Sequence, residues 1–307
     1  MNIFKMKVLS VGCVLSVLAA VSPRSLPAQA ADPVKPPSYL EWVDGAGKGD
    51  SEKAYMLGMA YYYSMFGAEK DNAKARQWFL KAANAGNGRA CRQLGDMYYS
   101  GWGVPAAKGE AMKWYRKGSD KGDAEAQEKL ADMYYYGEGA GRDYSEAFKL
   151  YRKAAETASE PGPSAKLGRM YMMGEGVKQD QPEALKWFLK ADGMGDKQVP
   201  AYIAELYRAN LGIKKDLPKA VEWLIKGSVQ GDVVAMQRLA EAYADGEGVA
   251  QSDLEAYKWL SVVLAKEKNV PAEQLFARVA KKMSFLEQAS AKRQASALVK
   301  KYVGDQD

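Results

Sequence analysis

A period of about 36 residues runs through most of this 307-residue chain and limits what it can fold into. Tryptophan recurs at steps of 36, 36, 73, 36 and 36 residues, at Trp42, Trp78, Trp114, Trp187, Trp223 and Trp259, with Leu150 in the middle of the double step. Leucine or isoleucine recurs at steps of 36 or 37, at Leu57, Leu94, Leu130, Leu167, Ile203 and Leu239. Self-similarity at such a period is typical of repeat proteins, whose units bury their apolar faces against their neighbours. The chain is therefore expected to stack similar units side by side.

Each unit is predicted to be a hairpin of two helices. Every leucine or isoleucine of the second column is followed by a small residue one position on and by a tyrosine four positions on, at Tyr61, Tyr98, Tyr134, Tyr171, Tyr207 and Tyr243. Residues four apart share one helix face, and a small neighbour lets a second helix approach closely. A glycine turn such as 137–139 ends the first helix, and a pair such as Gly122-Asp123 ends the second. No segment has a strand pattern, so the fold class is all-α.

The repeat resembles a known family. The pattern A-x-x-x-L-G-x-M-Y-x-x-G-x-G-V, then A-x-x-W-Y-x-K-A-A and a closing G-D, is similar to the Sel-one-like repeat (SLR), and residues 90–123 and 165–196 show it most fully. These repeats are tetratricopeptide-like hairpins of about 36 residues. The resemblance implies a right-handed α-solenoid of about six hairpins of 36–37 residues, with a groove that is lined mostly by the first helices and binds extended peptides or protein surfaces. Two departures, at 64–66 and 160–163, predict local irregularity.

The chain divides into four parts on this interpretation. We expect a signal peptide over 1–30, a linker and N-terminal capping helix over 31–50, six repeats over 51–265 and C-terminal capping helices over 266–307. Trp42 lies in the lone leading helix. Two closing helices are expected, separated by a capping box of Ser284 and Glu287.

The first 30 residues have the three parts of a secretory signal peptide. Lys5 and Lys7 precede an apolar run over 8–21, and 28–30 is an A-x-A site. The run is too short for a membrane anchor, which needs roughly 20 apolar residues. Because residues 1–30 hold three basic residues and no acid, cleavage would lower the net charge from +6 to +3. We expect a monomer that is periplasmic or secreted and binds neither nucleic acid nor membrane.

Composition excludes several kinds of catalysis. The chain has no histidine, which removes Ser-His-Asp and Cys-His catalysis and histidine-bound zinc. It also lacks an S-x-x-K motif, the nucleophile pattern of serine β-lactamases. Two cysteines cannot make a disulfide framework, and Cys91 is expected to be a buried, inert thiol. The sequence therefore predicts no enzyme, no cofactor and no metal.

Candidate binding residues are sought where the repeats differ. One residue beyond the packing tyrosine, the first three repeats carry Tyr62, Tyr99 and Tyr135, whereas the last three carry Met172, Arg208 and Ala244. Adjacent helical residues face about 100° apart, so these three tyrosines are expected to leave the packed stripe and form an aromatic ladder. The alternative is that they fill gaps between hairpins.

Two other features have alternatives of their own. Trp102 occupies a turn position that is glutamate in three other repeats, so it either contacts a partner or covers a neighbouring helix. A lysine column near the ends of the second helices is expected to be a solvated face that suits the helix dipole; it consists of Lys81, Lys117, Lys153, Lys190 and Lys226.

These observations favour an exported, non-catalytic adaptor that holds a protein or peptide in its groove. By resemblance, such proteins serve in envelope regulation or assembly. Two alternatives stay open: a carbohydrate-binding module that stacks Tyr62, Tyr99, Tyr135 and Trp102 on sugar rings, and a β-lactam or cell-wall hydrolase.

Overall fold

The computed structural model describes residues 37–304 and shows fifteen helices and no strand over that range. The helices are α1 (Pro37–Gly47), α2 (Ser51–Tyr63), α3 (Asn72–Asn84), α4 (Gly88–Ser100), α5 (Lys108–Asp120), α6 (Ala124–Tyr136), α7 (Tyr144–Thr157), α8 (Gly162–Met173), α9 (Gln181–Gly193), α10 (Val199–Ala209), α11 (Leu217–Val229), α12 (Val233–Asp245), α13 (Asp253–Lys266), α14 (Val270–Lys282) and α15 (Phe285–Val303). The expected signal peptide lies outside these residues.

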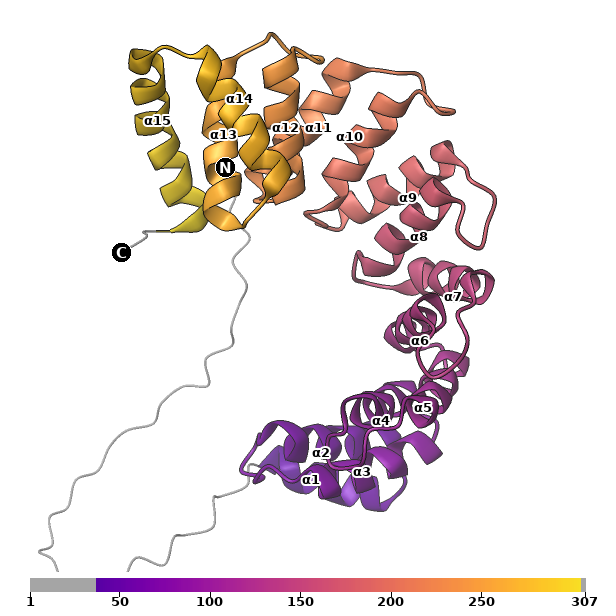
Figure 1. Cartoon of the computed structure of the whole chain (residues 1–307). Coiled ribbons are helices and arrows are strands. Elements are labelled where there is room, and N and C mark those ends of the chain that lie inside the picture. The colour runs from indigo at the N-terminus through magenta and orange to yellow at the C-terminus, as the bar shows by residue number, and fades with distance from the viewer. Residues whose placement is uncertain (1–36, 305–307) are drawn as a thin grey trace, which may run out of the picture.

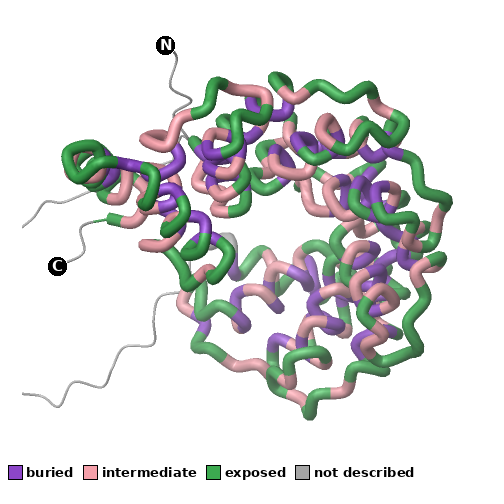
Figure 2. The backbone as a smooth tube through the Cα atoms, turned by 45° about the horizontal axis from the view of Figure 1, so that its top comes forward, coloured by how far each residue is buried: buried purple, intermediate pink, exposed green. Residues whose placement is uncertain are grey.

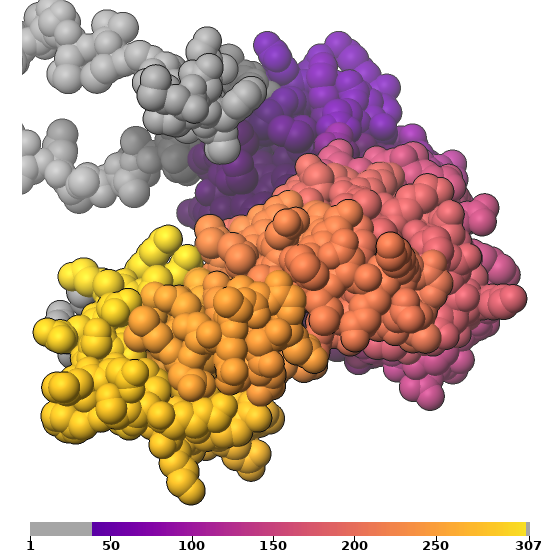
Figure 3. Space-filling view, turned by 90° about the horizontal axis from the view of Figure 1, so that it is seen from above, coloured from indigo at the N-terminus to yellow at the C-terminus, as the bar shows by residue number. Residues whose placement is uncertain are grey.

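The helices form one curved stack. Six hairpins, from α2/α3 to α12/α13, follow one another in chain order along an arch, with α6 on its inner side and α7 on its outer side (Figure 1). The backbone curves round an open centre, with buried segments along the middle of the helical layer (Figure 2). Seen from above, the orange repeats and the yellow C-terminal helices make one continuous surface (Figure 3). The all-α solenoid is confirmed.

Most of the repeated columns form the core, as the period predicts. The leucine or isoleucine of every repeat is buried, from Leu57 to Leu239, and so is the alanine three residues before that repeat's own column tryptophan or Leu150. The small residue after the leucine lets the second helix approach, since a Cβ on Gly95 would lie 2.4 Å from the Tyr115 ring. The tryptophans and the packing tyrosines are half-buried and cover this core.

The turn inside each hairpin has two residues with positive φ, separated by one residue. Glycine or asparagine fills these positions in five repeats, but the first repeat uses Ser64 (φ 56°) and Phe66 (φ 55°) and adds a third residue with positive φ, Gly67 (φ 73°). The second glycine is needed because the turn touches the preceding hairpin: a Cβ on Gly176 would lie 2.1 Å from the Tyr144 carbonyl oxygen. The first repeat has no preceding hairpin. Phe66 packs there edge-on against Trp42 of α1, with the ring centres 4.9 Å apart. The first turn is also one residue longer than the others, because Asp71 N donates to Tyr61 O whereas Ala107 N donates to Tyr98 O. The irregularity expected at 64–66 is therefore present, and it is confined to this turn.

The second expected departure is real but local. α7 ends in extended backbone at Ala158, and α8 begins after Pro161 without a side-chain N-cap bond. Other first helices such as α6 begin at an aspartate that follows glycine, Asp123, whose carboxylate accepts from Ala126 N. The sequence 160–163 therefore replaces one capped junction, and the stack continues through it.

The lysine column joins consecutive hairpins. Lys117 lies 4.1 Å from the Trp114 ring centre, and other lysines of the column cover their own tryptophans in the same way. The same column reaches the end of the preceding second helix, where Lys153 Nζ donates to Ser119 O at 3.3 Å and Lys226 Nζ to Asp192 at 2.5 Å. All five lysines are exposed, as expected of a solvated face, and the ammonium groups of Lys153 and Lys226 also bond to the C-terminal ends of the preceding second helices.

The two ends of the stack are closed by extra helices. α1 carries Trp42 against the first repeat, as expected. α14 and α15 close the other end, and the capping box of Ser284 and Glu287 is present at the start of α15. α15 packs on α13, the last helix of the repeats.

The turn contact predicts an asymmetry between two glycines that both have positive φ. Gly195→Ala adds only backbone strain, about 1–2 kcal/mol, because its Cβ would have nothing within 4 Å. Gly176→Ala adds the same strain plus a clash with Tyr144 O. We expect urea unfolding to show a clearly larger loss of stability for Gly176→Ala, and equal losses would contradict the turn's role in stacking.

Candidate binding groove

The structure corrects the expected aromatic ladder at its first member. Tyr62 is only 8% exposed, and its ring lies 6.3 Å from that of Phe79 and 5.8 Å from that of Trp102. Burial raises the pKa of Tyr62 to about 12. The Tyr62 side chain points about 100° away from that of Tyr61 around the helix. Consecutive hairpins stack so closely that this face of the helix is covered by the next hairpin, so Tyr62 is buried.

The same column links four of the hairpins to the turn of the next one. Tyr99 donates to Glu138 at 2.5 Å, Tyr135 to Glu175 at 2.7 Å, and an Arg208-to-Glu247 pair at 2.8 Å occupies the equivalent position in the fifth repeat. The contact between Tyr62 and Trp102 is the aromatic form of this link. Tyr62 and the half-buried Tyr135 therefore follow the alternative interpretation, in which these tyrosines fill gaps between hairpins.

An aromatic cleft lies on the first helices of repeats one to three. It has a volume of about 520 Å³, and Tyr62, Tyr99 and Trp102 line it, whereas Tyr135 does not. Trp102 is 51% exposed, Tyr99 is 38% exposed, and two tyrosines that the sequence analysis missed are more exposed still, Tyr63 at 55% and Tyr136 at 63%. We call Tyr63, Tyr99, Trp102 and Tyr136 the exposed aromatic set.

The sequence did contain a signal for the two missed tyrosines, in the column that follows Tyr62, Tyr99 and Tyr135 by one residue. Tyr63 and Tyr136 end α2 and α6, and the equivalent residue at the end of α4 is Ser100. A small residue between two tyrosines in one column leaves room for a cleft between them. Ser100 lines that cleft.

The floor of the aromatic cleft is charged. Tyr115 of α5 donates to Asp96 at 2.8 Å, and Arg92 is shared among Asp96 (3.8 Å), Asp123 (3.4 Å) and Glu125 (3.1 Å). Burial raises the pKa of the Asp96 carboxyl above its usual range, although Tyr115 and Arg92 oppose the shift. By contrast, hydrogen bonds from Lys108 and Tyr99 lower the pKa of Glu138 at the rim.

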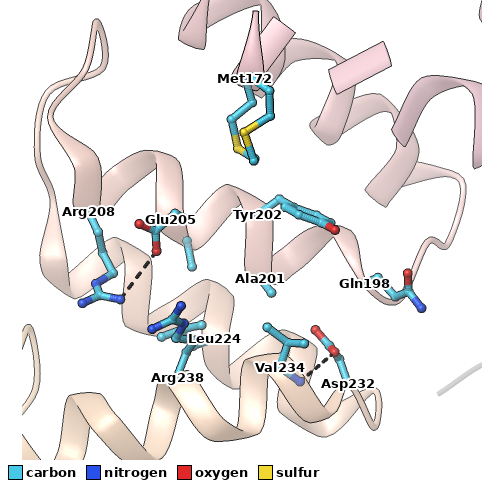
Figure 4. A pocket seen from close by; sticks show the side chains of 12 residues that line it. Met172, Gln198, Ala201, Tyr202, Glu205, Arg208, Leu224, Asp232, Val234 and Arg238 are labelled. Carbon is cyan, nitrogen blue, oxygen red and sulfur yellow. Dashed lines mark hydrogen bonds and ion pairs between the residues drawn. The ribbon is translucent and has the colours of Figure 1, made fainter. Parts of the chain in front are cut away.

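A second, apolar cleft lies on the first helices of repeats four to six. It measures about 370 Å³ between Met172 of α8 and the helices α10 and α12 (Figure 4). Ala201, Leu224 and Val234 line it, and the Tyr202 ring lies across it (Figure 4). Glu205, Arg208 and Arg238 lie at one end and Gln198 and Asp232 at the other. The sequence analysis named Met172 and Arg208 only as departures from the tyrosine column.

Neither a metal centre nor an activated nucleophile is found in the described part of the chain. Residues 37–304 hold no group of three potential metal ligands and no helix long and apolar enough to cross a membrane. Cys91 is 2% exposed, as expected, and burial raises the pKa of its thiol. A raised pKa disfavours the reactive thiolate.

Comparison with known sequences identifies the repeat. The Sel1 repeat profile matches residues 54–87, 88–123, 124–156, 165–191, 201–232 and 233–261. This chain belongs to the Sel1 repeat family. Sel1 repeat proteins generally act as non-catalytic scaffolds for protein interactions.

One relative of known structure shares the fold, and other relatives match shorter parts of the chain. A Sel1 repeat protein from Oxalobacter formigenes is 28% identical, with a TM-score of 0.66, over 75% of this chain and 99% of its own. Cysteine rich protein B from Helicobacter pylori is 25% identical over 42% of this chain and 92% of its own, with a TM-score of 0.35. HRD3A, a component of an ERAD-associated ubiquitin ligase in Arabidopsis thaliana, is 38% identical over 52 residues, so this chain spans 8% of that relative's length.

The burial of Tyr62 predicts that two tyrosines of α2 and α6 differ sharply in their effect on stability. Removing a buried aromatic ring costs about 3 kcal/mol or more, so Tyr62→Ala should lower the free energy of unfolding by that amount. Tyr136→Ala should cost less than about 1 kcal/mol, because its ring is mostly exposed. Thermal and urea unfolding of both variants test this difference. Equal destabilisation by the two substitutions would contradict the placement of Tyr62.

The raised pKa of Asp96 predicts a pH-dependent effect. A carboxyl whose pKa is higher in the folded chain destabilises the fold when ionised, and this cost disappears as the pH falls through that pKa. Asp96→Asn keeps an acceptor for Tyr115, so it should be at least as stable as wild type near pH 7, with a difference that shrinks toward about pH 4.

Asp132 of the next repeat is the matched control for this substitution. Lys166 lies 2.6 Å from its carboxylate and Tyr151 donates to it at 2.5 Å. Asp132→Asn should therefore cost about 1 kcal/mol or more near neutral pH. Urea unfolding across pH measures both variants. A comparable loss for Asp96→Asn would contradict the account of Asp96.

Proposed function

We propose that this Sel1 repeat protein holds an extended segment of a protein partner along its inner surface and catalyses no reaction. One observation carries the proposal: both the aromatic cleft and the apolar cleft lie mainly on the first helices of consecutive hairpins. Large aromatic side chains such as Tyr and Trp are common anchors of interfaces, because they offer area with little loss of entropy. The scaffold role of the family supports the same function.

We further propose that the protein is exported and acts in the cell envelope. The proposal rests on the sequence of residues 1–30, with its basic start, short apolar run and A-x-A site. The exported chain would work as a monomer in the periplasm or outside the cell, in envelope regulation or assembly.

Carbohydrate binding is the second candidate, and the exposed aromatic set is the observation that favours it. Trp102 and Tyr136 present more than half of their surface to solvent. Polysaccharides are abundant in the envelope, so a test of the proposed function must separate a glycan from a protein.

Cross-linking capture from envelope extract tests the proposed function. Full-length protein is compared with Tyr63→Ala/Trp102→Ala/Tyr136→Ala, which should stay folded because all three residues are more than half exposed. Loss of an interface anchor typically costs about 1–4 kcal/mol of binding, so the triple variant should lose most of its captured protein. Lys113→Ala/Lys149→Ala/Lys186→Ala, on exposed positions of the second helices, is the control and should capture normally. Capture of glycan alone would favour the second candidate.

A further inference from the structure

The aromatic cleft combines exposed rings with a carboxylate floor, and this combination selects among possible partners. We propose that it binds the lysine or arginine side chain of an extended peptide segment, with Asp96 facing the cation. This inference deepens the proposed function and rests on it, since it names the chemistry of the segment that the groove holds.

The rings form the walls of such a site. Tyr63 and Tyr136 come from the ends of α2 and α6, Tyr99 from α4, and Trp102 from the turn that follows α4. A cation above the face of an aromatic ring is attracted by the ring's quadrupole, most strongly above tryptophan. The chain already uses this contact, because Lys108 lies 5.3 Å from the centre of the Tyr99 ring at the rim.

The balance of charge in the cleft favours a cation. Four carboxylates line it (Asp96, Glu125, Asp132 and Glu138) against two basic residues, Arg92 and Lys129, although the whole chain carries a net charge of +6. An anionic segment would meet this excess of carboxylates, and an uncharged sugar would leave it uncompensated. Charge complementarity therefore points to a basic segment.

Asp96 is the carboxylate that lacks a close cation of its own. Glu138 has Lys108 at 2.7 Å, Asp132 has Lys166 at 2.6 Å and Glu125 has Arg92 at 3.1 Å, whereas the nearest ion-pair distance to Asp96 among the described residues is 3.8 Å, to Arg92. The hydroxyl of Tyr115 occupies one of its two oxygens.

The raised pKa of Asp96 supports this assignment. It means that burial of the charge outweighs the favourable contacts from Tyr115, Arg92 and Lys129, with Asp123 adding to the cost. An incoming ammonium or guanidinium group would supply the missing compensation. The bound segment then gains an interaction with a carboxylate that is already held in place by α4 and α5.

The apolar cleft lacks both features that make the aromatic cleft suited to a cation, namely an excess of carboxylates and exposed aromatic rings. Its lining contains Glu205 and Asp232 against Arg208 and Arg238, which gives no excess of either charge. Its exposed apolar side chains are Met173 and Val234, and no exposed aromatic ring lines it. A basic side chain therefore belongs in the aromatic cleft, and an apolar neighbour of the same segment fits the second cleft.

Selection from a phage-displayed library of random dodecapeptides tests the inference with the full-length protein. Peptides selected by wild type should be enriched in lysine and arginine about fivefold over the library. Asp96→Asn should still select peptides but lose this enrichment. Glu156→Gln, at an exposed carboxylate of α7 outside both clefts, should select the same basic peptides as wild type.

Each other outcome overturns a defined part of the account. Selected peptides without basic enrichment, or an enrichment that survives Asp96→Asn, would overturn the cation assignment and leave the peptide groove standing. Failure of wild type to select any peptide above background would overturn the groove as well. Retention of neutral oligosaccharides on a glycan array, lost in Trp102→Ala, would assign the aromatic rings to a sugar instead.

Discussion

Close stacking of consecutive hairpins is the constraint on which the rest of this structure depends. A single helical hairpin cannot bury its apolar stripe, so each one needs a neighbour on either side. The turn glycine of one hairpin lies against the backbone of the preceding one, as at Gly176 and Tyr144, and lysines reach across to the ends of preceding helices, as from Lys153 to Ser119. Where the first hairpin has no predecessor, Phe66 takes the glycine position and packs on α1.

The same stacking determines which side chains are available for binding. The residue after the packing tyrosine is turned against the next hairpin, where Tyr62 meets Trp102 and Tyr99 meets Glu138. The residue after that one points away from this contact. At this position Tyr63 and Tyr136 are exposed in the first and third repeats, and Ser100 occupies it in the second. The aromatic cleft is thus a product of the spacing between repeats as well as of the residues in them.

Much of the fold could be predicted from the sequence, because the same pattern of apolar and small residues occurs six times with a period of about 36 residues. The buried leucine and alanine columns, the leading helix with Trp42 and the capping box at Ser284 follow from local patterns. What failed depended on geometry between hairpins. The column of Tyr62 was expected to leave the packed stripe, and the contacts of the exposed lysine column with preceding helices were not foreseen. Both sets of contacts join residues about 34–40 positions apart.

The candidate site was predicted only in part for the same reason. The sequence drew attention to Tyr99 and Trp102, which do line an exposed cleft, but it gave no indication that Asp96 lies beneath them. Its neighbours Tyr115 and Arg92 belong to different helices, and only the packing of α4 against α5 brings them together.

The central claim is that the inner helices, and not the outer ones, bind the partner. Photo-crosslinking with benzoylphenylalanine at single positions tests it most directly, with the amino acid placed at Tyr136 or Val234 on first helices and at Lys113 or Lys186 on second helices. These four residues are all exposed, so each position reports what lies beside it. The account predicts that the partner crosslinks at Tyr136 and Val234 and not at the two lysine positions. Crosslinking at Lys113 or Lys186, without any at Tyr136 or Val234, would contradict it.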